Sequence, residues 1–340
     1  MEGNFPEFSF SGTPSEIGFE HGKLMKEKIR KALQFYKKTW QTDDENILKV
    51  VEPFKITTRK HFPDLAQEIE GIAEGADLDV NWIYALNSRT EILAQFRSDS
   101  PTECTAAYFS EPRILAQNWD WAEELEELVF LMRIEKDGMS ILQLTEPGII
   151  GKIGMNTHGI GVCLNLLKTG KEAWGVPVHV LLRVVLESSS IGEVQKNLEP
   201  VKFGKSSNFL IGDARGNYLS LEFATDHVYS ARLTDSYMVH TNHFLRSPIN
   251  KDPVEFASSF ARYDRASQLV PTQPKTIQGM KDLLADQGNL DLPICRPYVE
   301  DELIGNVGTV TSIIMDLVKR ELHITKGNPF ENPYITIYLR

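Results

Sequence analysis

The chain has 340 residues and 41% hydrophobic content, enough for a sizeable core in one large domain or two modest ones. Its formal net charge of -11 argues against nucleic acid or an anionic membrane as main partner, because no lysine and arginine block offsets it. Three cysteines are too few for a disulfide framework, which favours a reducing compartment. Residues 1–6 lack the cationic and apolar parts of a secretory signal, and no apolar run reaches membrane-spanning length. We therefore expect a cytoplasmic location.

The part of the chain before Cys104 is predicted to be mainly helical. Thr13-Pro14-Ser15-Glu16 has the pattern of a capping box with proline at the first helical position, and this helix is expected to reach about residue 36. Two further helices are expected over residues 63–75 and 81–96, because apolar residues recur there at helical spacing.

From Cys104 onward, short β-rich runs alternate with turn residues, which predicts an antiparallel meander. Its expected strands are 105–109, 114–119, 129–135, 140–145, 149–155 and 159–165. Helices are then predicted over 178–187 and 191–198, followed by strands at 208–211, 218–223, 228–232 and 237–241. Helices at 254–269 and 277–285 and strands at 309–316 and 321–325 complete the chain. Strands, helices, strands, helices and strands in this order are typical of a layered α+β domain.

Cys104 is the main candidate for a catalytic residue. It precedes an Asn-Trp-Asp step that ends at Asp120. This context suggests a nucleophile that works after the chain is cut in front of it, because an N-terminal cysteine has both a thiol and a free α-amine. The amine has a reference pKa of about 7.7–8.0 and can serve as the base that ionises the thiol. The alternative for a lone cysteine is a small buried hydrophobic residue.

Several motifs, in order, resemble the isopenicillin N acyltransferase family: GTPSEIGFEHG, NSRTE, ECTAAY, AQNWDW, TEPGIIGKIGMNTHGIGVCLN, VHTNH and PICRPY. The resemblance covers nearly the whole chain. It implies a self-processing N-terminal-nucleophile hydrolase with a four-layer αββα sandwich, in a single domain over residues 1–340. Residues 1–103 would be a mainly helical pro-segment, and residues 104–340 the catalytic chain. Relatives act on linear amides, and the chemistry implies no cofactor and no metal.

One residue departs from the family pattern. The fungal acyltransferases have glycine before the cysteine, whereas this chain has Glu103. Self-cleavage needs a strained scissile bond, which glycine accommodates at no steric cost. We expect cleavage between Glu103 and Cys104 nonetheless. The alternative is an uncleaved, non-catalytic homologue that binds a small ligand.

The resemblance also implies roles for four further residues. Asp120 would orient the α-amine of Cys104, although aspartate at a strand end commonly only caps a turn. Asn242 and Asn165 would donate to the developing oxyanion, although such amides usually satisfy backbone groups. Arg296 would lower the pKa of the thiol by its positive charge, although an arginine flanked by apolar residues commonly packs its stem on them or pairs with an acidic surface group.

His240 and His243 permit two other interpretations. Their H-x-x-H spacing suggests a metal site, but no third ligand follows at a recognisable spacing. Either histidine could instead be the base of a Cys-His peptidase. Both alternatives are weaker than the N-terminal-nucleophile interpretation, and we expect no metal.

Two pairs near the predicted site have less specific interpretations. Arg89 and Glu91 are expected to pair with each other and to support the helical segment. Trp119 and Trp121 share one face of a strand, so they belong either to the core or to a pocket wall.

The sequence thus predicts an amidohydrolase that acts on small linear N-acyl amides through an acyl-thioester at Cys104. The first alternative is an acyltransferase that moves an acyl group from a thioester donor to an amine. The expected partner is a small-molecule amide or acyl thioester. The sequence defines neither that molecule nor an oligomeric state.

Overall fold

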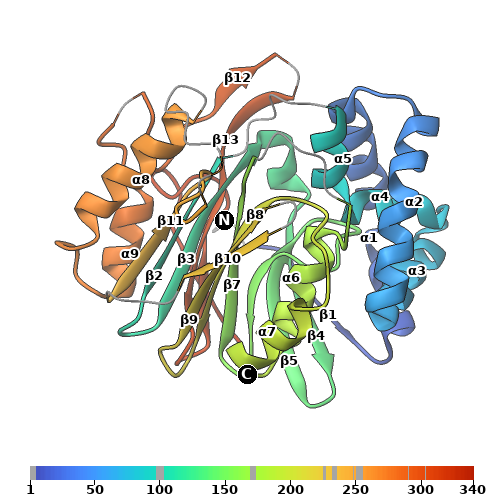
Figure 1. The fold of residues 1–340 in the computed structure, drawn as a ribbon, viewed down its shortest axis with the longest axis horizontal. Helices are drawn as coiled ribbons and strands as arrows, with labels where there is room; N and C mark the ends of the chain where they lie inside the picture. Colours follow the sequence, from blue (N-terminus) through green and yellow to red (C-terminus); the bar gives the residue numbers. More distant parts are fainter. Residues whose placement is uncertain are drawn as a thin grey trace.

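The computed structural model describes residues 5–96, 103–168, 174–224, 227–231, 236–247, 249, 256–289, 291–302 and 304–340. Two β-sheets pack face to face, and helices cover their outer faces (Figure 1). This arrangement confirms the predicted αββα sandwich with a helical N-terminal segment.

The first sheet has the strand order β1-β4-β5-β6-β7-β8-β9-β10 in the described residues. Its strands are β1 (Glu7–Ser11), β4 (Phe130–Lys136), β5 (Met139–Thr145), β6 (Ile153–Asn156), β7 (Ile160–Leu166), β8 (Ser207–Asp213), β9 (Tyr218–Ala224) and β10 (His227–Ala231). β1 runs parallel to β4, whereas the other pairs are antiparallel. The N-terminal segment is therefore joined to the sandwich as an edge strand.

The second sheet has the order β11-β2-β3-β13-β14-β15, and β12 also pairs with β13. Its strands are β2 (Glu103–Phe109), β3 (Ile114–Ala122), β11 (Tyr237–His240), β12 (Val299–Asp301), β13 (Gly305–Asp316), β14 (Glu321–Ile324) and β15 (Ile335–Tyr338). β2 and β3 are central, and all their residues except Glu103 are buried. Strands buried on both faces are expected where a sheet lies between a second sheet and a helical layer.

A side chain joins the two sheets near Cys104. Gln117 on β3 donates to the carbonyl of Leu164 on β7 at 2.6 Å and accepts from its N–H at 2.8 Å. Because this buried amide satisfies both backbone groups of Leu164, it fixes the position of one sheet relative to the other beside the candidate site.

Two helical layers cover the sandwich. α6 (Val178–Leu186) and α7 (Ile191–Leu198) pack on the first sheet. α8 (Ala257–Leu269) and α9 (Ile277–Leu284) pack on the second sheet and appear in orange in Figure 1.

The N-terminal helices lie on the opposite side of the molecule from α8 and α9, as Figure 1 shows. They are α1 (Pro14–Trp40), α2 (Asp44–His61), α3 (Pro63–Ala76), α4 (Val80–Asn87) and α5 (Arg89–Phe96). The predicted capping box opens α1, where Glu16 and Thr13 satisfy each other's backbone N–H. α1 and α3 touch through glycines, since a Cβ on Gly75 would lie 2.0 Å from the carbonyl oxygen of Phe19. The predicted helices at α1 and α3 are thus confirmed.

Three expectations about secondary structure were wrong. The strands after Cys104 do not form one meander: β2 and β3 belong to one sheet and β4–β7 to the other, since a 3₁₀ turn (Glu123–Glu127) carries the chain across. The helix expected over 81–96 is two helices, α4 and α5. α2 was not predicted, although Asp43 caps it; Pro53 in its interior obscures the helical pattern.

Parts of two predicted elements, residue 232 of one strand and residues 254–255 of one helix, lie outside the described residues. Within the described part of the chain, no helix combines the length and apolar character needed to span a membrane.

Candidate active site

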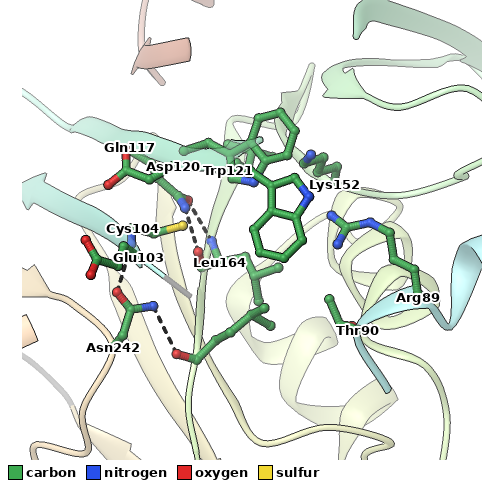
Figure 2. A pocket seen from close by; sticks show the side chains of 13 residues that line it. Arg89, Thr90, Glu103, Cys104, Gln117, Asp120, Trp121, Lys152, Leu164 and Asn242 are labelled. Carbon is green, nitrogen blue, oxygen red and sulfur yellow. Dashed lines mark hydrogen bonds between the residues drawn. The ribbon is translucent and has the colours of Figure 1, made fainter. Parts of the chain in front are cut away.

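Cys104 lies on β2 at the wall of a small cavity (Figure 2). Its backbone N–H, part of the peptide bond that would be cut, donates to Asn242 Oδ1 at 2.8 Å. The thiol is 7% exposed, and burial together with the nearby Asp120 charge raises its pKa to about 12. In the uncleaved chain the sulfur is therefore protonated, and it needs a local base to react.

Asp120 lies on β3 next to the candidate nucleophile, since its register partner across the β2–β3 pair is Glu103. Its Oδ1 accepts from the Thr309 hydroxyl at 2.7 Å. Its Oδ2 is buried and has no hydrogen-bond partner among the described residues. Burial raises the pKa of this carboxyl to about 7, although Arg262 and Thr309 oppose the shift. A buried carboxylate oxygen without a donor is costly unless a ligand or a chemical change supplies one.

Asn242 and Asn165 flank Cys104 in the uncleaved chain. The amide nitrogen of Asn242 donates to the Leu166 carbonyl at 3.0 Å, as Figure 2 shows, while its oxygen holds the Cys104 N–H. The amide nitrogen of Asn165 donates to the carbonyl of Cys104 at 3.1 Å. Both residues are thus next to the nucleophile, and here their amides bind backbone groups.

Arg296 contacts the residue before the nucleophile. Its guanidinium lies 2.7 Å from the carboxylate of Glu103. Glu103 lines the cavity of Cys104 and also a neighbouring cavity that contains Arg296. In the uncleaved chain, the charge of Arg296 is therefore paired with the side chain of Glu103.

Arg262 on α8 is a residue of this site that the sequence did not indicate. It is fully buried, and it donates to the carbonyl of Cys104 at 2.8 Å, to the Thr105 hydroxyl at 3.0 Å and to Asn242 Oδ1 at 3.0 Å. The one available signal was its position on the helix face shared with the buried residues Ser259 and Ala266. An arginine on an otherwise small, buried face needs a partner, and here the partner is the active-site backbone.

The two histidines of the H-x-x-H pair have separate hydrogen-bond partners. His240 Nε2 lies 2.9 Å from Glu222, and His243 Nδ1 lies 2.8 Å from the Ser259 hydroxyl. No cluster of three or more metal-ligating side chains occurs in the portion of the chain that the structure describes.

Charged and aromatic residues form the wall of the cavity opposite Cys104. Figure 2 shows Lys152 and Arg89 on that side, and Trp119 and Trp121 also line the cavity. Lys152 Nζ lies 3.0 Å from the centroid of the Trp119 ring. Both tryptophans are also buried members of the hydrophobic core, so the two interpretations of this pair hold together.

The expected Arg89–Glu91 pair is wrong, because the structure gives both residues other partners. Arg89 donates to Glu146 at 2.7 Å, and Glu91 accepts from the backbone N–H of Val178 at 2.7 Å. Glu146 follows the end of β5, far from Arg89 in sequence, so no local pattern predicted this contact.

The structure is a four-layer αββα sandwich of the N-terminal-nucleophile hydrolase type, and it has a buried cysteine on a central strand beside an aspartate and two asparagines. The comparisons identify the family within that class. The model of the family described as acyl-coenzyme A:6-aminopenicillanic acid acyl-transferase matches residues 109–331. The 40 kDa form of acyl-coenzyme A:6-aminopenicillanic-acid-acyltransferase from Emericella nidulans is 33% identical over an alignment of 338 positions, and the match covers 95% of this chain and 92% of that protein. The chain belongs to this family.

Two solved structures are similar in fold at low sequence identity. Penicillin V acylase from Agrobacterium tumefaciens gives a TM-score of 0.48 at 13% identity, over 69% of this chain and 86% of that one. A mutant of the conjugated bile acid hydrolase from Clostridium perfringens gives a TM-score of 0.46 at 12% identity, over 71% of this chain and 97% of that one.

Proposed function

We propose that the chain cuts itself before Cys104 and then acts as an N-terminal-cysteine amidohydrolase on small linear N-acyl amides. Cleavage would leave a pro-segment of residues 1–103 and a catalytic chain of residues 104–340. The Cys104 α-amine would take the thiol proton, and the sulfur would attack the amide carbonyl. The α-amine would pass that proton to the leaving amine of the substrate as the C–N bond breaks. Water would then hydrolyse the acyl-thioester and release the acid.

The observation that carries this proposal is the unpartnered Oδ2 of Asp120. Cleavage converts the Cys104 peptide N–H into an amine with additional N–H donors, at a position already next to Asp120. Asn242 Oδ1 is 2.8 Å from the same nitrogen and would hold it in place. The new amine would thus satisfy a carboxylate oxygen that the uncleaved chain leaves buried without a donor.

The remaining groups would act on the carbonyl and on the charge of the site. After cleavage, the amide nitrogens of Asn242 and Asn165 would turn toward the substrate oxyanion, where one donor is worth about 2.7–4 kcal/mol. Arg262 would keep the Cys104 carbonyl and Asn242 in place. Arg296 would supply the positive charge near the sulfur, once Glu103 no longer neutralises it.

Self-cleavage would use the same sulfur but not the α-amine, which is still part of the peptide bond. The thiol of Cys104 would add to the carbonyl of Glu103, and its proton would pass to the peptide nitrogen as the C–N bond breaks. Water would then hydrolyse the resulting thioester, which frees the Glu103 carboxyl group and restores the Cys104 thiol. The ion pair of Glu103 with Arg296 would hold the scissile carbonyl in place of the strain that glycine allows elsewhere in the family.

Intact mass spectrometry of the purified chain tests the cleavage. We expect two fragments that divide at Cys104, and one species with the Cys104→Ala variant. Cys163→Ala is the matched control, since Cys163 is another buried cysteine and its replacement should leave cleavage unchanged. A single wild-type species of 38.5 kDa would contradict self-processing and favour the uncleaved ligand-binding homologue.

The acyl-enzyme tests the chemistry. Incubation with hexanoyl-p-nitroanilide should add a hexanoyl group to the fragment that begins at Cys104 and release p-nitroaniline. Absence of both products, for this and other acyl amides, would contradict the amidohydrolase proposal.

Acyl transfer is the second candidate, and the relative from Emericella nidulans, an acyltransferase, favours it. The first half of the reaction is the same, and an amine takes the place of water at the thioester. Hexanoyl-coenzyme A with and without 6-aminopenicillanic acid would separate the two. An amide product that exceeds free hexanoate would favour the transferase.

A further inference from the structure

Two histidines flank Asn242 in the motif VHTNH, and the structure shows what holds each of them. The ring of His240 is fully buried, with Nε2 2.9 Å from a carboxylate oxygen of Glu222 and Nδ1 2.7 Å from the carbonyl oxygen of Thr241. Both partners are acceptors, so both ring nitrogens donate and the imidazolium forms a buried ion pair with Glu222. This pair anchors the chain just before Asn242.

The carboxylate of Glu222 also binds the chain after Asn242. Its two oxygens accept from the backbone N–H of Leu245 at 2.6 Å and from that of Arg246 at 3.0 Å. Glu222 is 1% exposed and lies on β9, whereas β11, which leads into Asn242, belongs to the other sheet. One buried carboxylate thus closes the segment 240–246 into a loop that contains Asn242.

A second anchor holds Asn242 from the helical layer. The backbone N–H of Asn242 donates to the hydroxyl of Ser259 on α8 at 2.7 Å, and the Thr241 hydroxyl donates to the Ser259 carbonyl at 3.0 Å. His243 Nδ1 lies 2.8 Å from the same Ser259 hydroxyl, and its ring stacks on Phe260 with the centroids 4.0 Å apart. The backbone of Asn242 is therefore held on two sides, from β9 and from α8.

This double anchoring matters because the side chain of Asn242 reaches the nucleophile, as Figure 2 shows. Its Oδ1 lies 2.8 Å from the Cys104 nitrogen, and its amide nitrogen is the donor that the proposed function assigns to the oxyanion. A donor stabilises the transition state only when its position is set beforehand, and a displacement of about 1 Å can cost about 100-fold in rate.

We propose that Glu222 and Ser259 are positioning residues, which hold Asn242 in place for stabilisation of the oxyanion without touching the substrate. The inference rests on the proposed function, because that role of Asn242 belongs to it. It also gives the H-x-x-H pair a purpose: each histidine joins the segment around Asn242 to one of the two anchors.

Turnover per cleaved chain tests the role of Glu222. Glu222→Gln keeps the shape but has one accepting oxygen instead of two, so its NH2 group faces a donor of the segment 240–246. With hexanoyl-p-nitroanilide we expect kcat to fall about 10–100-fold and KM to change by less than about 3-fold, because the oxyanion forms only in the transition state. Intact mass counts the fragment that begins at Cys104, so uncleaved protein does not enter kcat.

Two further variants make the result specific. Glu68→Gln is the matched control: it makes the same change in a buried carboxylate that binds Arg183, and it should lower stability while kcat per cleaved chain stays unchanged. Ser259→Ala removes the second anchor, so it should lower kcat about 3–10-fold even if Glu222→Gln does not fold.

A double-mutant cycle shows whether Glu222 acts through Asn242. Asn242→Ala alone should slow turnover about 100–1,000-fold, and Glu222→Gln in that background should have less than about a twofold further effect. A further loss as large as that in the wild-type background would mean that Glu222 acts independently of Asn242, which would overturn the inference. So would equal losses of kcat in Glu222→Gln and Glu68→Gln.

Hydrogen exchange separates this inference from the proposed function. It is measured in the Cys104→Ala variant, which needs neither cleavage nor turnover. The addition of Glu222→Gln should speed exchange of the Leu245 and Arg246 amides about tenfold or more, since both lose their acceptor. If the wild type forms no acyl-enzyme but this acceleration is seen, the amidohydrolase proposal fails and the positioning of Asn242 by Glu222 stands. Unchanged exchange at both amides would overturn the inference whatever the catalytic result.

Discussion

Two buried groups of charged side chains differ in how completely they are hydrogen-bonded. Between α6 and α3, Arg183 donates to both carboxylate oxygens of Glu68 at 2.9 Å and, through Nε, to Glu187 at 3.0 Å. Every guanidinium nitrogen there has a partner. Around the cavity, by contrast, one oxygen of Asp120 has no donor and one nitrogen of Arg89 has no acceptor in the part of the chain that the structure describes.

This difference separates structural from functional burial of charge. In a fully hydrogen-bonded ion pair, the contacts between the partners offset the free-energy cost of removing both charges from water. Removal of one partner leaves the other charge buried and uncompensated. A buried charged group with an unpaired hydrogen-bonding atom keeps part of this desolvation cost, and a ligand or a chemical step that supplies a partner can remove it. The two groups therefore respond oppositely to substitution.

The largest expected effect is on the saturated pair. Glu68→Gln leaves the buried Arg183 with incomplete neutralisation, so the free energy of unfolding should fall by about 3 kcal/mol. Chemical denaturation measures the loss, and kcat/KM of the folded variant should stay near the wild-type value. A stable variant with impaired catalysis would contradict the distinction.

Asp120→Asn should have the converse result. The variant replaces a carboxylate of which one oxygen, Oδ2, has no donor among the described residues, so the free energy of unfolding should change by less than about 1 kcal/mol. Orientation of the α-amine would be lost, and cleavage or turnover should slow by at least about 100-fold. The rate of fragment appearance and the rate of p-nitroaniline release measure this effect. Wild-type rates in this variant would exclude Asp120 from the mechanism.

The sequence predicted those candidate site residues that a local motif brings together. Cys104 and Asp120 lie on adjacent strands of one hairpin, so their short separation along the chain indicates that they are close in space. Arg262 and Lys152 were missed because packing brings them to the site: α8 folds over β2, and the turn after β5 places Lys152 beside Trp119. The layered fold followed from the order of strands and helices. The sequence did not predict which strands belong to which sheet, because β3 and β4 have the pattern of consecutive strands of a hairpin.

The smallest expected effect concerns the one donor that Asp120 already has. The Thr309 hydroxyl donates to Asp120 Oδ1 and accepts from the Arg296 N–H at 3.0 Å, and it lowers the pKa of the carboxyl. Thr309→Val removes this donor, so the pKa of Asp120 should rise further above about 7. More of the carboxyl is then protonated at a given pH, and the acid limb of the kcat profile should move to higher pH by about one unit or less.

Thr309→Ser keeps the hydroxyl and loses the methyl group instead, so it is the control for a change of side-chain shape at this position. Its acid limb should coincide with that of the wild type, while its kcat at high pH should match that of Thr309→Val. An unshifted limb in Thr309→Val would mean that the Asp120 carboxyl does not titrate in catalysis. Asp120 would then position the α-amine of Cys104 in the same protonation state at every pH of the profile. Its Oδ2 would be the atom that accepts the hydrogen bond from the amine.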